Sequence, residues 1–363
     1  MKTKLPPVQL PLMAAGLLTL LAALWAGLIR VGWRLPALQP MLPALHGPLM
    51  ISGFLGTLIS LERAVAIKRP WTFVGPVLSG LGAVWLMIGL PMVVGQWLLL
   101  LGSVGLTAVF IHIVRQHPAS YTVTMGLGAV CWLVGNALWL SGWPIFRIVY
   151  WWAGFLVLTI VGERLELSRV ARLSANTIRL FVGAVLLFAM GLLVVLGWGG
   201  IGTRLIGLGL LALAIWLGLF DIARKTVRRT GLTQYIAVNL LLGYGWLAIG
   251  GITALIIGQA VAGPRYDFML HAVFVGFVFG MIFAHAPIIL PSILPLHIQF
   301  QPILYGPTIL LHLALLLRAL GDVGAWQPVR AWGGMFNAIA ILWFLGQMIF
   351  LARTANNSTG IVK

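Results

Sequence analysis

Apolar residues are gathered into twelve long runs, and short segments between them hold most of the charged and turn-forming residues. The runs lie near residues 10–29, 44–67, 73–94, 97–114, 121–140, 145–162, 178–197, 202–221, 235–257, 268–290, 303–320 and 332–352. Each is about 18 to 24 residues long, enough for a helix to cross roughly 30 Å of hydrocarbon. The pattern predicts an all-α integral membrane protein, with twelve transmembrane helices forming one domain over residues 1–363.

Composition agrees with this pattern, because 61% hydrophobic and 8% charged residues exclude a water-soluble globule. The net charge of +17 is best explained by short basic loops against the anionic headgroups of a lipid bilayer, so we expect no nucleic-acid partner. With the N-terminus inside, sixteen of the 23 Lys and Arg residues fall in cytoplasmic segments. We therefore expect a multi-pass protein of the cytoplasmic (inner) membrane with both termini in the cytoplasm.

Weak self-similarity divides the runs into three groups of four, near residues 1–120, 121–232 and 233–363. Glu62-Arg63 ends span two and Glu163-Arg164 ends span six, 101 residues later. These pairs are interpreted either as ion pairs that hold helix ends at the headgroups or as proton-entry groups.

The single cysteine, Cys131, excludes a disulfide within the chain and covalent CxxCH haem attachment, so a metal would need His, Met or carboxylate ligands. Among seven histidines, His46 begins span two and His271 begins span ten, at the same predicted depth near the external face. Two neutral imidazoles from neighbouring helices are a common means of holding b-type haem iron. The alternative for each is an interfacial histidine bonded to water or to a backbone carbonyl.

Small residues after His46 favour the interpretation of this histidine as a haem ligand. Gly53 and Gly56 lie on about one face of the predicted helix and would leave a shallow groove for a flat macrocycle. The alternative is an ordinary small-residue seam between packed helices.

A second, inner haem or metal site is a further hypothesis. His285 is the fourteenth residue after His271, roughly 21 Å along a regular helix and displaced by only about 40° around it. Its partner would have to be His112 or His312. The alternative is a buried histidine that binds a carbonyl freed by Pro287.

The two histidine helices resemble those of known haem proteins. Spans two and ten hold the low-spin haem in the main subunit of the heme-copper oxidases, to which the chain is distantly similar. Residues 45–54 (LHGPLMISGF) and 271–282 (HAVFVGFVFGMI) resemble more closely the NnrS family, twelve-helix haem proteins associated with nitric oxide tolerance. The oxidase copper ligands on spans six and seven are missing here, and Met269 stands where a second haem ligand would be. We therefore expect heme b and no copper.

Arginines at the external ends of the helices are candidates to bind the haem propionates. The 101-residue offset between the Glu-Arg pairs places Arg147 in register with His46, and Arg265 lies just before span ten. A guanidinium fork can bind a carboxylate bidentately. The alternative is an arginine that extends to the headgroups.

The preferred hypothesis is thus a membrane b-type haem protein with bis-His ligation, acting in electron transfer or in nitric oxide binding and tolerance. A redox partner or a quinone would be implied, and enzymatic activity is left open. The alternative is a haem-free transporter or channel for a small solute. Its path would be lined by the few polar groups within the spans, namely Asn136, Asn239, Tyr244 and Asn337.

Overall fold

The structure, a computed structural model, describes residues 8–294 and 298–360. Within these residues it contains helices and no strand, and twelve segments are long and apolar enough to cross a membrane. The predicted all-α, twelve-span fold is therefore confirmed. Three of the sixteen basic residues expected in cytoplasmic segments (Lys2, Lys4 and Lys363) and one of the seven histidines (His297) lie outside the described residues.

The predicted boundaries agree well except at the third span. It was expected over 73–94, but helix α4 (Val74–Met87) ends earlier, and α5 starts at Met92. Gly89 between them has φ +81°, a left-handed conformation that favours glycine, and Pro91 precedes α5. Together these residues form a turn inside an apolar run, where hydropathy alone gives no boundary.

The chain divides into two compact units, Met1–Thr159 and Ile160–Lys363, which are described separately. Their boundary falls inside helix α7 (Ile145–Leu167). It therefore coincides with neither boundary between the three predicted groups of four helices.

The first unit begins with α1 (Gln9–Val31). The second span follows as one continuous helical segment of changing pitch: η1 (Leu42–Leu45), α2 (His46–Pro48), η2 (Leu49–Leu55) and α3 (Gly56–Ile67). Next come η3 (Pro70–Phe73), α4, α5 (Met92–Gln116), α6 (Ser120–Leu140) and the first part of α7. Helices α4 and α5 meet closely at Gly75 and Gly105, where a Cβ on Gly105 would lie 2.7 Å from the Gly75 Cα.

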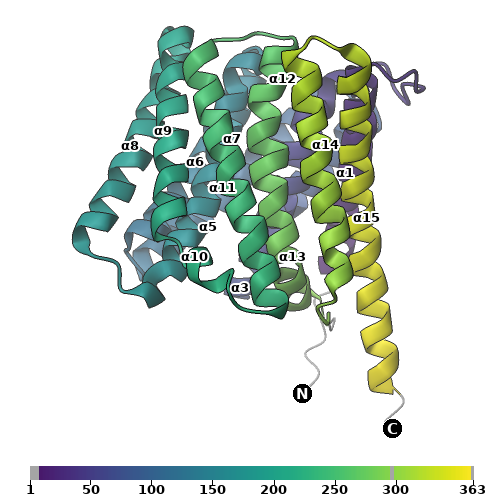
Figure 1. Cartoon of the computed structure of the whole chain (residues 1–363). Coiled ribbons are helices and arrows are strands. Elements are labelled where there is room, and N and C mark those ends of the chain that lie inside the picture. Colours follow the sequence, from purple (N-terminus) through teal and green to yellow (C-terminus); the bar gives the residue numbers. More distant parts are fainter. Residues whose placement is uncertain (1–7, 295–297, 361–363) are drawn as a thin grey trace. The chain divides into compact units, whose positions relative to one another are not determined.

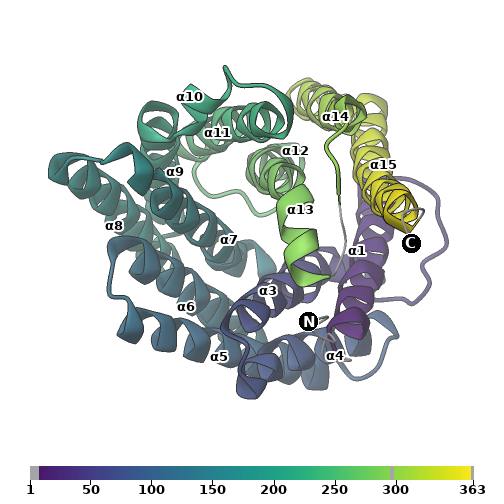
Figure 2. The same cartoon turned by 90° about the horizontal axis from the view of Figure 1, so that it is seen from below.

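The second unit contains the end of α7, η4 (Ser168–Ala171), α8 (Ala175–Gly197), α9 (Gly199–Phe220), α10 (Ala223–Thr226) and α11 (Gly231–Ile257). The tenth span consists of α12 (Pro264–His271), η5 (Ala272–Phe279) and α13 (Gly280–Ile293). Then follow η6 (Pro302–Leu304), α14 (Tyr305–Val323) and α15 (Gln327–Gly360). Helices α8 and α9 lie side by side in Figure 1, as do α14 and α15 in Figure 2.

Candidate functional site

In the part of the chain that the structure describes, two spans contain a π-helical segment, and in each the segment follows a candidate histidine. His46 lies three residues before η2, and His271 lies directly before η5; both η2 and η5 are π-helical. Regular α-helix resumes at Gly56 and at Gly280. Because π turns are rare and occur frequently at functional sites, their presence beside both histidines makes His46 and His271 candidate functional residues.

The imidazole of His46 packs against the backbone of α1. Its Nδ1 lies 2.7 Å from the carbonyl oxygen of Ala23. Gly27 makes room for the ring, since a Cβ at that position would lie 2.8 Å from the His46 Cε1. A carbonyl can only accept, so Nδ1 carries the proton and Nε2 carries the lone pair, the tautomer in which an imidazole ligates a metal through Nε2.

His271 has the same tautomer and an additional charged neighbour. Its Nδ1 lies 2.8 Å from the carbonyl oxygen of Asp267 and 3.2 Å from the carboxylate Oδ1 of the same residue. Arg318 on α14 donates to this carboxylate through Nε (2.8 Å) and Nη2 (2.9 Å). A bidentate pair of this kind holds the carboxylate in one orientation beside the imidazole.

A second acidic residue completes the group, which we call the Asp267 cluster: Asp267, His271, Arg318, Arg330 and Asp322. Arg330 on α15 places its Nε 2.9 Å from Asp322 Oδ1 and 3.5 Å from Asp267 Oδ2. The Asp322 side chain is only 1% exposed. Sequence reasoning missed both aspartates and both arginines as a site, although the i,i+4 spacing of Asp267 and His271 was a readable signal.

The expected glycine groove after His46 is filled by protein side chains. A Cβ on Gly56 would lie 2.3 Å from the Trp132 indole, and one on Gly53 would lie 3.0 Å from the Ala83 Cβ and 3.1 Å from the Thr19 Cγ2. The packing at Gly53 and Gly56 therefore gives no support to the haem-groove interpretation. They form the small-residue seam that was the alternative.

Arg147 lies at the start of α7 with its guanidinium over the rings of Trp143 (5.7 Å) and Phe146 (6.0 Å). Its Nε is buried and has no hydrogen-bond partner. One turn further along the helix, the Nε1 of buried Trp151 also lacks a partner. Residues four apart share a helix face, so this face of α7 presents two buried N–H groups without an acceptor.

The other proposed propionate ligand, Arg265 on α12, is exposed. The two arginines therefore have different surroundings. Arg147 lies near buried N–H donors that have no acceptor, whereas Arg265 faces outward.

The three remaining candidate histidines have varied surroundings. His112 packs its ring edge-on to Trp71, with centroids 5.8 Å apart. His312 is buried and accepts a hydrogen bond at Nδ1 from Trp246 Nε1 (3.1 Å), so the proton is on Nε2 and the ring is not arranged to ligate through that atom. Among the described residues, no group of three or more His, Cys, Asp or Glu could hold a metal ion.

A π-helical segment between His271 and His285 changes the displacement expected for a regular helix. The path from His271 to His285 runs through η5, where the wider π turn replaces the 100° step of an α-helix. The expected displacement of about 40° therefore does not apply. His285 instead donates from Nδ1 to the carbonyl of Met281, one turn earlier, at 2.8 Å.

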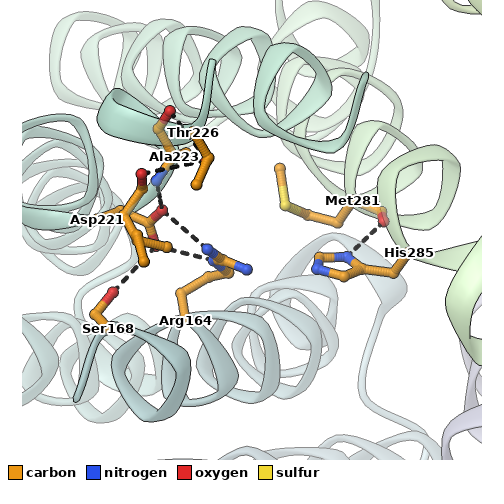
Figure 3. A network of polar contacts seen from close by, with 8 residues as sticks. Arg164, Ser168, Asp221, Ala223, Thr226, Met281 and His285 are labelled. Atoms are coloured by element: carbon orange, nitrogen blue, oxygen red, sulfur yellow. Dashed lines mark hydrogen bonds and ion pairs between the residues drawn. The ribbon is translucent and has the colours of Figure 1, made fainter. Parts of the chain in front are cut away.

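Figure 3 shows the surroundings of His285, whose ring faces the guanidinium of Arg164. Arg164 donates from Nε and Nη2 to the two carboxylate oxygens of Asp221, at 2.9 Å each. Asp221 also accepts from the Ala223 backbone N–H (2.7 Å) and the Ser168 hydroxyl (3.4 Å). Sequence reasoning did not connect Arg164 with Asp221, because 57 residues separate them.

The pair Glu62-Arg63 forms the expected local contact, with 3.7 Å between Oε1 and Nη2. This agrees with an ion pair at a helix end, the first of the two interpretations.

Two of the four polar residues that would line a transport path, Asn136 and Asn239, form hydrogen bonds with neighbouring helices. Asn136 Oδ1 accepts from Ser52 (3.0 Å) and Trp152 (3.1 Å), and its Nδ2 donates to the Leu99 carbonyl (3.2 Å). Asn239 Oδ1 accepts from the Thr308 hydroxyl at 3.2 Å. These amides join helices within their units, so they give no support to a polar path.

A family model described as Domain of unknown function (DUF8744) matches residues 9–353. No curated protein and no solved structure matches the chain.

Proposed function

We propose a function for this chain, which belongs to the DUF8744 family, from its own residues: it is a membrane b-type haem protein whose iron ligands are His46 and His271. It acts in electron transfer or in nitric oxide binding and tolerance. The cytoplasmic membrane as its location, with both termini inside, belongs to the same proposal and rests on the distribution of basic residues.

The observation that carries the proposal is a local construction that occurs twice. In spans two and ten, a histidine near the start binds a backbone carbonyl through Nδ1 and is followed by a π-helical segment. Haem-ligating and metal-ligating histidines commonly have such a bond, which orients the ring and leaves the lone pair on Nε2. Because both spans have this histidine–carbonyl bond and this π-helical segment, they support a shared role for His46 and His271.

Haem would supply an iron centre that accepts and releases one electron and can bind a gas. His46 and His271 would hold the group, and ligation by two histidines favours electron transfer over gas binding. The buried N–H groups of Arg147 and Trp151 are suited to a carboxylate such as a haem propionate, because an acceptor there would remove the cost of two unpaired donors.

The test is the haem content of histidine variants purified from haem-supplemented cells. His46→Ala and His271→Ala should each lose most of the haem per protein, measured as the pyridine haemochrome, while still inserting into the membrane. His285→Ala and His112→Ala are matched controls that truncate the same side chain elsewhere and should keep the wild-type haem content. Retention of haem by both His46→Ala and His271→Ala would reject the proposal.

A stoichiometry of two haems in wild type, falling to one in either control variant, would instead identify an inner site involving His285 or His112.

A further inference from the structure

The histidine at the start of span ten is held by one residue through two different groups. Asp267 offers its carbonyl oxygen at 2.8 Å and its Oδ1 at 3.2 Å to the Nδ1 of His271. A carbonyl alone is sufficient to fix the tautomer. The carboxylate therefore adds something else, namely a negative charge at the back of the imidazole.

Two arginine side chains hold the Asp267 carboxylate beside His271. Arg318 binds both of its oxygens, at 2.8 and 2.9 Å, and the Arg318 side chain is only 11% exposed. Arg330 approaches the Asp267 Oδ2 to 3.5 Å from α15. Contacts from two further helices thus hold the charge at a constant distance from the ring.

Acidic residues are scarce in this chain, and the cluster contains two of the six. Partly buried ion pairs are seldom more stabilising than apolar packing of similar volume, because desolvation offsets the Coulomb attraction. The cluster is therefore better explained by its effect on His271 than by stability alone.

We infer that Asp267 is a positioning residue for His271, and that the Asp267 and Arg318 charges set the reduction potential of iron bound by that histidine. The inference rests on the proposed function. A carboxylate that accepts the Nδ1–H makes the imidazole a stronger donor through Nε2, which favours oxidised iron and lowers the potential. Arg318 withdraws part of this negative charge and opposes the effect.

The experiment is a redox titration of purified holoprotein, combined with low-temperature EPR of the oxidised state. Asp267→Asn should favour the reduced state about tenfold, which raises the midpoint by about 59 mV for one electron. It should also shift the low-spin EPR signal toward a weaker axial ligand field. Arg318→Gln should lower the midpoint.

Glu166→Gln is the matched control, since it removes the same charge from an exposed pair with Arg169. It should leave both the midpoint and the EPR signal unchanged. A shift of the EPR signal in Asp267→Asn, together with its midpoint, identifies an effect through His271, because a change in net charge alone would not alter the axial ligand field.

The outcomes distinguish the inference from the function. A wild-type protein without haem would reject the proposed function. A haem-bound wild type whose midpoint and EPR signal are unchanged by Asp267→Asn would reject the inference alone.

Where Asp267→Asn does not fold, the charge-balanced double variant Asp267→Asn/Arg318→Gln serves in its place. It should raise the midpoint by less than the single variant, because the nearer of two opposite charges dominates. An unchanged or lowered midpoint in the double variant would overturn the inference.

Discussion

Two adjacent tryptophans on α7 offer a paired test of whether this helix faces a ligand. Trp151 and Trp152 are both buried, but Trp152 Nε1 donates to Asn136 at 3.1 Å whereas Trp151 Nε1 has no acceptor. Substitution by Phe removes the same atoms at both positions. The difference in the free energy of unfolding between the two variants therefore reports the contribution of the N–H group.

The magnitude follows from the hydrogen bond. An intramolecular bond contributes about 0.5–1.5 kcal/mol net, while a buried donor without a partner costs about 1–3 kcal/mol. In haem-free protein, Trp152→Phe should therefore lower the free energy of unfolding by at least about 1 kcal/mol more than Trp151→Phe. In the haem-bound protein this difference should narrow by roughly 1.4 kcal/mol, because Trp151→Phe now removes a donor to a propionate and weakens haem binding about tenfold.

The assay is unfolding in detergent with and without haem, together with competition between haem and its dimethyl ester, which has no free carboxylate. Wild type should prefer the free acid, and Trp151→Phe should lose part of that preference. Equal destabilisation of haem-free protein by both variants, with an unaltered preference for the free acid, would refute the reasoning about unpaired donors.

Three further substitutions test separate parts of the account. Arg147→Leu should retain haem but lower its midpoint in a redox titration, since loss of a nearby positive charge favours oxidised iron; an unchanged or higher midpoint would contradict the propionate contact. Asp221→Leu should destabilise the protein by about 3–5 kcal/mol in detergent unfolding, because Arg164 is left as a buried unpaired charge, and Arg164→Met in the same chain should recover most of the loss. Gly56→Ala should cost about 1–3 kcal/mol by overpacking against Trp132, and wild-type stability in that variant would show that the seam is looser than described.

The spans were predictable because hydropathy is a local property of the sequence. A run of about twenty apolar residues has few alternatives to a membrane helix, so the number and approximate limits of the helices follow directly. The turn at Gly89 lies inside an apolar run, and this explains the error in the third span.

The site was predictable only in part. His46 and His271 could be singled out because each begins a span, but the π-helical segments after them leave no simple signal in residue type. The space beside Gly56 is filled by Trp132, and this contact depends on how α6 packs. No periodicity within span two contains that information.

Long-range ion pairs were the largest omission. Each of the three aspartates lies in contact with an arginine of another helical element: Asp221 with Arg164, Asp267 with Arg318, and Asp322 with Arg330. A buried carboxylate is costly in a membrane protein unless it is paired, so an aspartate near a span predicts that a partner exists. The sequence does not identify the partner, because several arginines lie at suitable depths.

The most direct test of the central claim is the visible absorption spectrum of wild-type protein purified from haem-supplemented cells. The protein should show a Soret band that shifts and sharpens on reduction with dithionite, with the α and β bands of a low-spin, bis-His b-type haem. Well-folded, full-length protein that shows no Soret band, and acquires none on incubation with haem, would contradict this claim.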